Sequence, residues 1–287
     1  MKVIPFQVPK ISKEAFRIQV DSALVFYDKL HHHPETQIMY IKSGAGTLIA
    51  GDYVGRFTSG NLFLIGSNQP HVFKSDEIYY EPKSKLRSNS ISLYFEEKYA
   101  GENFWQMNEL AEIRQFILNA GVGYRIEGET KVQLIGLIEE VSNAKSIERL
   151  IVFMQLLKTL SESHELKPLS ATNSQTLFTA NEGKRMNDIL QFTFRESHRK
   201  IKTLEVAEVA NLSPAAFCRY FKVRTRKTYT NFLNEVRISH ACKLLIEGDP
   251  NIQSVCYKVG FHNLSHFNRQ FKKVTGKTPS RYIRPGI

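Results

Sequence analysis

The sequence predicts two domains, an N-terminal β-barrel or β-sandwich and a C-terminal all-α domain, with a helical segment between them. Short runs of apolar or alternating residues, separated by turn residues, occupy residues 4–95. From about residue 102 the apolar residues recur at three- and four-residue steps. The last hundred residues contain one pattern twice, fifty positions apart. A chain of 287 residues is long enough to form a core in each domain.

The predicted strands are short, and residues that favour turns bound them. They cover residues 18–20, 37–41, 46–49, 61–65 and 90–94. Ser43-Gly44 and Ser59-Gly60 are typical of the turns between them. Short strands at regular spacing indicate a sandwich or barrel, and we assign residues 1–100 to it.

Helical periodicity then continues to residue 163, in predicted helices over 104–119, 131–141 and 146–163. The third helix has an apolar stripe. The residues on this stripe or beside it are Ile147, Leu150, Ile151, Met154, Leu157, Lys158 and Ser161. Either the β domain or a partner helix must cover this stripe. We expect a homodimer, and we assign residues 101–165 to packing and dimerisation. The polar residues 166–182 are predicted to form an interdomain linker.

The C-terminal domain, residues 183–287, is built on the repeat. Residues 211–228 align without a gap with residues 261–278, which pairs Phe217 with Phe267, Arg219 with Arg269, Phe221 with Phe271 and Lys222 with Lys272. Each copy predicts a short helix, a turn and a second helix, and a long helix over 228–247 connects the copies. We expect Thr203 to cap one helix, and Ser213 followed by Pro214 to begin the next.

Basic residues concentrate in this domain. From residue 183 onward there are 20 Lys and Arg against 7 Asp and Glu, a net charge of +13, whereas the rest of the chain carries −2. A polyanionic partner explains this asymmetry, since bound phosphates release their counterions. Two tandem helix-turn-helix units on a basic segment favour binding to double-stranded DNA at neighbouring turns.

Composition also indicates a compartment. The cysteines, Cys218, Cys242 and Cys256, are odd in number and lack metal-ligand spacing, which indicates a reducing cytosol. No signal peptide and no apolar run of membrane length is present. We therefore expect a cytoplasmic protein that has no membrane partner.

Candidate DNA-binding residues lie on the second helix of each repeat unit. The two phenylalanines of each helix share one face, which is expected to be core. The opposite face carries Ala215, Cys218, Arg219 and Lys222 in the first unit, and Ser265, Asn268, Arg269 and Lys272 in the second. Arg219 and Arg269 can each bind guanine O6 and N7, with a phosphate contact as the alternative.

The second unit resembles the signature of a known family. The spacing typical of the AraC/XylS family of bacterial transcription regulators is matched by Ile252, Val255, Gly260, Phe261, Asn263, Ser265, Phe267, Arg269, Phe271, Lys272, Lys273, Gly276, Thr278, Pro279, Ser280 and Tyr282. The resemblance extends over residues 183–282. It implies two recognition helices in successive major grooves, and it implies RNA polymerase as a partner. Arg226 departs from the pattern, since it replaces the helix-closing glycine and predicts a differently shaped turn.

The N-terminal domain is similar to the cupin β-barrel that holds effectors in many such regulators. In catalytic cupins a His-x-His pair, a Glu and a later His bind a metal, and His31, His33 and His71 stand at the histidine positions. Gln37 stands where the Glu is expected, and a neutral amide is a poorer ligand for a hard cation. The four residues are candidates for an effector site without metal. A metal site and a structural role are the alternatives.

The chain has no nucleophile elbow, phosphate-binding glycine loop or zinc-finger spacing. We therefore expect a DNA-binding transcriptional activator and not an enzyme, without a cofactor, controlled by a small-molecule effector such as a sugar. Two alternatives stay open. One is a metal-dependent cupin enzyme fused to a DNA-binding module, and the other is a constitutive DNA-binding dimer whose barrel binds no ligand.

Overall fold

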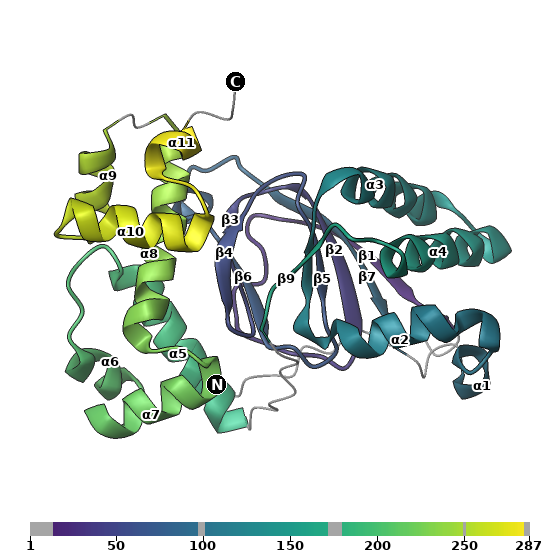
Figure 1. The fold of residues 1–287 in the computed structure, drawn as a ribbon, viewed down its shortest axis with the longest axis horizontal. Helices are drawn as coiled ribbons and strands as arrows, with labels where there is room; N and C mark the ends of the chain where they lie inside the picture. The colour runs from purple at the N-terminus through teal and green to yellow at the C-terminus, as the bar shows by residue number, and fades with distance from the viewer. Residues whose placement is uncertain (1–13, 97–100, 172–179, 249–250, 284–287) are drawn as a thin grey trace. The chain divides into compact units, whose positions relative to one another are not determined.

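The computed structural model describes residues 14–96, 101–171, 180–248 and 251–283, which fall into two compact units (Figure 1). We call them the β unit, which contains the described residues of 4–46 and 57–177, and the helical unit, which contains the described residues of 47–56 and 178–287. Strands β3 (Gly46–Ala50) and β4 (Tyr53–Phe57) thus belong almost wholly to the helical unit. Nothing in the sequence pattern indicated this grouping.

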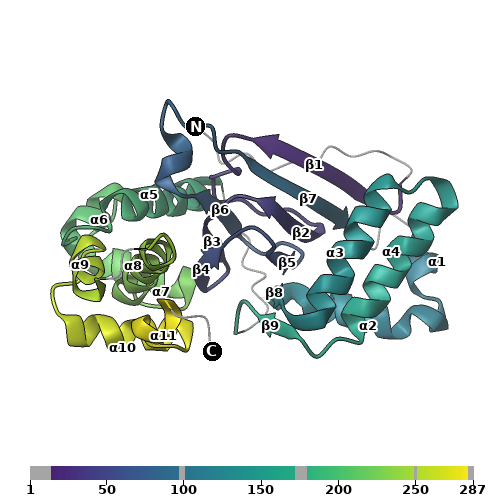
Figure 2. The same ribbon diagram turned by 90° about the horizontal axis from the view of Figure 1, so that it is seen from above.

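A six-stranded antiparallel sheet forms the framework of the β unit (Figure 2). Across the sheet its strands are β1 (Arg17–Ala23), β7 (Ser88–Phe95), β2 (Thr36–Ser43), β5 (Leu62–Ile65), β8 (Tyr124–Ile126) and β9 (Leu166–Pro168). Strand β6 (His71–Ser75) belongs to the same unit. The predicted strands near residues 20, 40, 63 and 92 are confirmed.

Strands β8 and β9 are absent from the sequence prediction. Residues 166–168 were assigned to a linker, yet they pair with β8 at the edge of the sheet, where Leu166 lies opposite Ile126. The glutamate before β9 explains part of this placement, because the carboxylate of Glu165 accepts the backbone N–H of Thr130 at 2.7 Å. Residues 172–179 of the expected linker lie outside the described residues, and α5 (Ala180–Glu196) begins directly after them.

Helices of the predicted segment 101–165 cover one face of the sheet (Figures 1 and 2). They are α1 (Glu102–Trp105), α2 (Ala111–Asn119), α3 (Gly128–Asn143) and α4 (Ser146–Ser161), and the short 3-10 helices η2 (Asn108–Leu110) and η3 (Ala120–Val122) lie on either side of α2. A further 3-10 helix, η1 (Glu77–Tyr80), precedes β7. The single helix predicted over 104–119 is therefore broken.

Alternation along β7 sets the two faces of the sheet. Ile91, Leu93 and Phe95 are buried in one apolar cluster with Phe153 and Leu157 of α4. Because successive strand side chains point to opposite faces, the residues between them lie on the other side. The residues of β7 on that side are Ser88, Ser90, Ser92 and Tyr94. The sheet therefore has an apolar face under the helices and a polar face away from them.

The apolar stripe predicted on α4 packs largely on its own unit. Leu157 is completely buried, and Leu150 and Met154 are partly buried against the same cluster. Of the two covers that the sequence leaves open, the chain's own β domain and a partner helix, the first therefore covers most of the stripe. Ile147 and Ile151, by contrast, are 66% and 44% exposed, and they lie four residues apart on one face of the helix.

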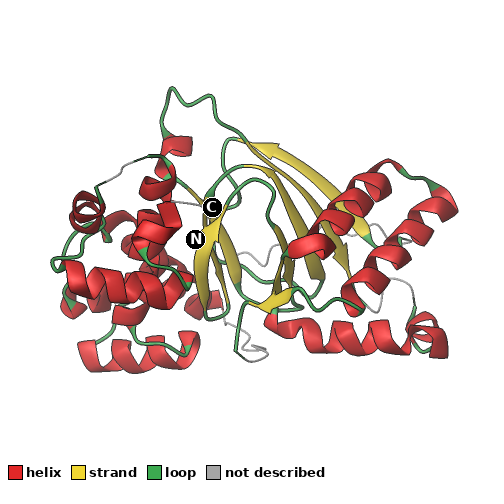
Figure 3. Ribbon diagram, turned by 45° about the horizontal axis from the view of Figure 1, so that its top comes forward, coloured by secondary structure: helices red, strands yellow, loops and turns green. Residues whose placement is uncertain are grey.

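The described part of residues 178–287 contains only helices (Figure 3). After α5 come α6 (Thr203–Val209), α7 (Pro214–Thr225), α8 (Tyr229–Ile246), α9 (Ile252–Lys258), α10 (Leu264–Thr275) and α11 (Pro279–Ile283). Helix α8 lies between the α6–α7 pair and the α9–α10 pair (Figure 1). The two predicted helix-turn-helix units and the long connecting helix are present.

The repeat in sequence is also a repeat in hydrogen bonding. The side chains of Ser213 and Asn263 each accept a backbone N–H at the first turn of α7 and α10. At the other end, the hydroxyls of Thr225 and Thr275 each lie 2.8 Å from the carbonyl oxygen of the buried phenylalanine four residues earlier. The repeated threonine therefore holds the last turn of each recognition helix.

Two expectations about helix ends are wrong. Thr203 is the first helical residue of α6 and not its cap, and the carboxylate of Glu205 instead accepts the N–H of Lys202 at 2.7 Å. The turn after α7 does not differ in shape from the turn after α10. Arg226 has φ +59° and Gly276 has φ +75°, so both are left-handed. Arg226 thus adopts, at the end of α7, the left-handed conformation that Gly276 adopts at the end of α10.

Arg237 of α8 connects the chain that follows α5 with the second helix-turn-helix unit. Its buried guanidinium donates from Nε to the carbonyl of Ser197 at 2.8 Å and from Nη2 to that of Arg199 at 2.7 Å. The same group lies 5.6 Å from the ring centroid of Phe261, in the second unit. Gly260 approaches from that side too, because a Cβ on it would lie 2.5 Å from the Ser197 oxygen.

The left-handed arginine yields a stability prediction. A residue with a Cβ loses about 1–2 kcal/mol in this conformation, and a glycine loses about 0.5–1 kcal/mol of that gain to chain entropy. We therefore expect Arg226→Gly to raise the free energy of unfolding by roughly 0.5–1 kcal/mol, and Gly276→Ala to lower it by a similar amount. Urea unfolding of the full chain without DNA, followed by far-UV circular dichroism, measures both. A lower midpoint for Arg226→Gly would contradict the strain argument.

Candidate functional site

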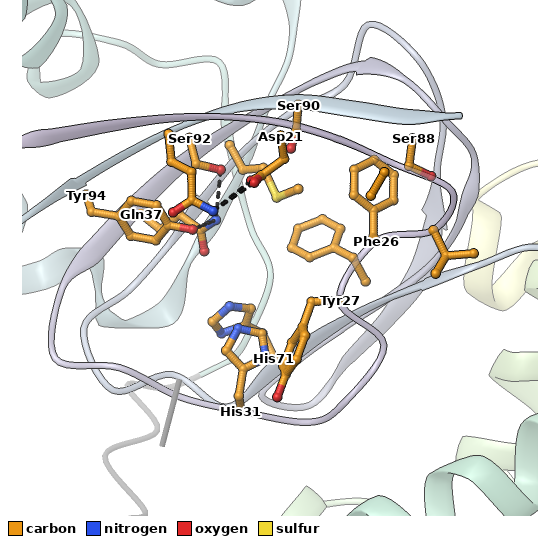
Figure 4. A pocket seen from close by; sticks show the side chains of 15 residues that line it. Asp21, Phe26, Tyr27, His31, Gln37, His71, Ser88, Ser90, Ser92 and Tyr94 are labelled. Carbon is orange, nitrogen blue, oxygen red and sulfur yellow. Dashed lines mark hydrogen bonds between the residues drawn. The ribbon is translucent and has the colours of Figure 1, made fainter. Parts of the chain in front are cut away.

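A cavity of about 330 Å³ lies within the β unit, against the polar face of the sheet (Figure 4). Its lining comes from β1, β2, β6 and β7 and from the segment before His31. Cavities of this size are typical of sites for small molecules. The volume suits a ligand of the size of a monosaccharide.

Alternate residues of β7 form the polar wall of the cavity. Ser88, Ser90, Ser92 and Tyr94 all line it, and each serine is 1% exposed. Among the described residues, the hydroxyl of Ser90 has no hydrogen-bond partner. A buried polar group without a partner costs about 1–3 kcal/mol, so this hydroxyl is a candidate contact for a bound molecule.

Gln37 is held in place on the adjacent strand. Its amide nitrogen donates to the hydroxyls of Ser92 and Tyr94, each at 3.1 Å, as drawn in Figure 4. Its amide oxygen lies 3.4 Å from Nε2 of His33. Burial raises the pKa of Tyr94, so this phenol stays protonated at neutral pH. The amide is thus oriented by neutral groups alone.

Aromatic and sulfur-containing side chains form the apolar wall. Phe26, Tyr27, Met39 and Phe73 line the cavity together with the polar row. The rings of Phe26 and Phe73 have centroids 6.3 Å apart, and Tyr27 stands edge-on to His31 at 4.9 Å. Apolar faces beside a row of hydroxyls suit a ligand that has both C–H surfaces and polar edges.

Two of the candidate histidines are brought together by the backbone. His31 and His71 exchange both backbone hydrogen bonds, at 3.1 and 2.9 Å, in an isolated antiparallel bridge. Their ring centroids are consequently 4.2 Å apart, and that of His33 is 5.1 Å from His71. The side chain of Gln69 braces the loop before His71, because it accepts the N–H of Gly66 and donates to the carbonyl of Val122.

All three rings are oriented through the same nitrogen. Nδ1 lies 2.9 Å from the carbonyl of Lys29 in His31, 3.0 Å from that of Glu35 in His33, and 2.8 Å from that of Gln69 in His71. A carbonyl oxygen can only accept, so each Nδ1 carries the proton. In the neutral rings of His31 and His71, Nε2 then has the lone pair. Nε2 of His33 instead lies 3.4 Å from the amide oxygen of Gln37, which can also only accept.

Burial keeps these rings neutral. It lowers the pKa of His31 to about 3, and it lowers the pKa of His71 well below the usual value, to which the neighbouring histidines add. Burial also lowers the pKa of His33, although the carboxylate of Glu35, 3.6 Å from Nδ1, acts in the opposite direction. At neutral pH burial therefore favours the uncharged form of all three rings.

The predicted effector residues lie together. His31, Gln37 and His71 line the cavity, and His33 lies beside them without being part of its lining. Sequence reasoning missed the serine row of β7, the aromatic wall, and Gln19 and Asp21 of β1. The alternation Ser88-x-Ser90-x-Ser92-x-Tyr94 was the available signal, since it places four polar groups on one face of a strand.

The predicted DNA-binding face is an exposed surface of the helical unit. All eight candidate side chains are exposed: Ala215, Cys218, Arg219, Lys222, Ser265, Asn268, Arg269 and Lys272. The phenylalanines on the opposite faces of α7 and α10 are completely buried, as expected. Each recognition helix therefore presents the predicted face outward.

A third face of α7 contacts α5. The guanidinium of Arg224 pairs with the carboxylate of Glu182, and the hydroxyl of Tyr220 donates to the Glu182 carbonyl at 3.1 Å. Arg224 is thus a structural contact, although it is basic and lies on a recognition helix. The outward arginine of α7 is Arg219.

Comparison with known proteins agrees with this architecture. Residues 16–90 match the model of an AraC-like ligand binding domain, and residues 206–285 match that of a helix-turn-helix domain. The first match covers most of the cavity lining and the second covers both recognition helices. In the described residues, no helix has the length and apolar character needed to cross a bilayer.

Curated relatives match most of the length of the chain. It is 23% identical to the transcriptional activator RhaS of Klebsiella pneumoniae over 267 residues, which cover 89% of this chain and 87% of the relative. It is 24% identical to the transcriptional activator RhaR of Mannheimia succiniciproducens, with 88% and 86% covered. A solved structure of ToxT from Vibrio cholerae is 17% identical, covers 94% of this chain and 98% of that one, and has a TM-score of 0.37.

The two domain matches lie over the cavity and over the paired recognition helices. The relatives are regulators of transcription and not enzymes. The chain therefore belongs to the AraC/XylS family of DNA-binding transcriptional regulators.

Proposed function

We propose that this protein activates transcription when a small, neutral, hydroxyl-rich molecule such as a sugar occupies the cavity of the β unit. The observation that supports this most is the row of buried hydroxyls on β7, with Ser90 lacking a partner among the described residues. The cavity places this row opposite apolar rings, and sugars combine hydroxyl edges with apolar C–H faces. An effector-free, constitutive regulator leaves the buried hydroxyl unexplained.

In the helical unit, we assign base recognition to Arg219 and Arg269 and phosphate contacts to Lys222 and Lys272. Equivalent positions in two copies suit two sites about one helical turn apart on the DNA, roughly 10 base pairs. Ser265 and Asn268 add hydrogen-bonding groups to the second unit, whereas Ala215 and Cys218 are small and offer few polar contacts. The second unit should therefore discriminate more strongly among bases.

Two further partners follow from this function. Ile147 and Ile151 of α4 form an exposed apolar strip that a second copy of the chain can cover, which favours a homodimer. An activator also has to engage RNA polymerase at the promoter, and DNA in a bacterium places the protein in the cytoplasm. A metal-dependent enzyme is disfavoured, since the relatives act on transcription.

The effector site predicts opposite effects for two serines of one strand. Without effector, Ser90→Ala should raise the free energy of unfolding by about 1 kcal/mol, because it removes an unpaired buried hydroxyl. Ser92→Ala should lower it by about 1 kcal/mol, because the amide of Gln37 loses an acceptor. Thermal unfolding with a panel of neutral monosaccharides should show a rise in Tm for wild type that is reduced in Ser90→Ala. A rise in Tm of equal size in wild type and in Ser90→Ala would contradict the assignment of Ser90 as a ligand contact.

The DNA face predicts separable roles. Arg269→Ala should relax base preference in one half of the binding site and Arg219→Ala in the other half, each at a cost of about 1–3 kcal/mol. Lys222→Ala and Lys272→Ala, the matched controls, should weaken binding to all sequences about equally. Selection from random DNA followed by sequencing measures this. If both arginine variants keep the wild-type preference and lose only affinity, the arginines contact phosphates.

The dimer predicts that charge on the exposed strip separates the copies. Ile147→Glu with Ile151→Glu should weaken self-association at least tenfold, about 1.4 kcal/mol, without unfolding the protein, since both side chains are exposed. Leu118→Glu on α2, where the leucine is 52% exposed, is the control and should leave association unchanged. Sedimentation velocity is the measurement. A wild-type monomer at high micromolar concentration would rule the dimer out.

A further inference from the structure

The edge strand β1 brings a carboxylate to the cavity. Of the described residues that line the cavity, Asp21 is the only acid, and none is a lysine or an arginine. Burial lowers the pKa of His31 and of His71. It raises the pKa of Tyr27 and of Tyr94. All four of these side chains are therefore neutral at neutral pH, and the lining carries a single negative charge.

The strand register places this carboxylate beside the hydroxyl of Ser90. In the antiparallel pair of β1 and β7, Asp21 lies directly opposite Ser90, and both line the cavity. Figure 4 shows the two side chains together on one side of the cavity, with His31 and His71 on the other side. Residues opposite each other in such a pair have Cβ atoms about 4.5–5.5 Å apart. Among the described residues, however, the Ser90 hydroxyl bonds to none, Asp21 included.

A neighbour on the same strand orients the carboxylate. The amide nitrogen of Gln19 donates to both oxygens of Asp21, at 2.8 and 3.0 Å. A carboxylate has about four acceptor sites, so this amide leaves others open to groups in the cavity. The next basic residue on this face of β1 is Arg17, which lies opposite Tyr94 and outside the lining. The charge of Asp21 therefore faces the cavity in a fixed direction.

We propose that Asp21 selects the effector by charge: its carboxylate accepts hydrogen bonds from two neighbouring hydroxyls of a neutral sugar, and it rejects acidic sugars and sugar phosphates. This inference rests on the proposed function, in which a hydroxyl-rich molecule occupies the cavity. It adds the residue that makes the cavity selective for neutral molecules.

The groups around Asp21 suit a pair of ligand hydroxyls. One ligand hydroxyl can donate its proton to the Asp21 carboxylate and accept the proton of Ser90 at the same time. An adjacent hydroxyl can donate to the second carboxylate oxygen. Hydrogen bonds to an ionised acceptor are roughly twice as strong as those between neutral groups. Phe26 and Phe73 also line the cavity and offer apolar surface to the C–H face of the same molecule.

An acidic ligand interacts unfavourably with the same residue. An ionised ligand carboxylate has no proton to donate to Asp21, and it adds a second negative charge beside the first. The described lining contains no lysine or arginine that offsets the repulsion. Because Asp21 is partly exposed, solvent screens the repulsion, and we expect a preference of about tenfold. The whole chain carries a net charge of +11, so this rejection of anions is a local property of the cavity.

Pairs of sugars that differ in one group test the proposal on the full-length protein. D-glucose, D-galactose and D-mannose are each compared with the uronic acid in which the terminal CH₂OH is a carboxylate. In titration calorimetry, wild type should bind the neutral member of a pair about tenfold more tightly than the acid. Asp21→Asn should weaken binding of the neutral sugar about tenfold and strengthen binding of the acid. A merely structural role would shift both affinities in the same direction.

Glu77→Gln is the matched control. It removes the same charge from an exposed side chain outside the lining, and it should change neither affinity. Salt provides a second test on wild type in case Asp21→Asn does not fold. High ionic strength screens the carboxylate, so the acid should bind more tightly as salt rises, whereas binding of the neutral sugar should stay constant.

Three results would overturn the assignment of Asp21. They are equal affinity of wild type for a sugar and its acid, losses of both affinities in Asp21→Asn, and binding of the acid that weakens as salt rises. If no neutral sugar binds, both this assignment and the proposed function are wrong. If a sugar binds with the expected selectivity but does not activate transcription, the proposed function alone is wrong.

Discussion

The two-residue alternation of β7 is the constraint on which the β unit depends. Ile91, Leu93 and Phe95 must face α4 to form the core, and this requirement alone turns Ser88, Ser90, Ser92 and Tyr94 to the other side. A shift of register by one residue would bury the serines under the helices and expose the core residues. The same packing that stabilises the domain therefore builds the polar wall of the cavity. One face of β7 belongs to the core, and the opposite face lines the cavity.

In the helical unit, one side chain likewise contacts two separate parts of the structure. The guanidinium of Arg237 closes the carbonyls that follow α5, and it also lies on Phe261 of the second helix-turn-helix unit. Burial lowers its pKa, yet an arginine keeps its charge, and carbonyls at a helix end are favourable partners for a cation. Gly260 allows the second unit to approach the carbonyls of Ser197 and His198, the first of which Arg237 also binds. Arg237 itself lies between the two repeated sequences and belongs to neither of them.

Sequence patterns located the features that follow local periodicity. The phenylalanines of the repeat, the outward arginines and the start of α7 at Ser213 and Pro214 follow from spacing and side-chain type, and the structure agrees. Strands β8 and β9 were missed because three residues are too few for an alternation signal. Long-range pairing creates them, since β8 pairs with β5 and β9 pairs with β8. The His31–His71 bridge is likewise a contact across forty residues. His31, Gln37 and His71 were located only through a family resemblance, and the rings that face them were not found.

The two recognition helices differ less than their sequences indicate. Arg226 in place of glycine suggested a looser end for α7, yet both helices end in a left-handed residue, and the same threonine hydroxyl holds both last turns. Both also begin with a side-chain cap at the equivalent position. Their backbones therefore present side chains in the same way. Any difference in base preference between the units must arise from the side chains themselves, Ala215 and Cys218 against Ser265 and Asn268, because the scaffold that carries them is repeated.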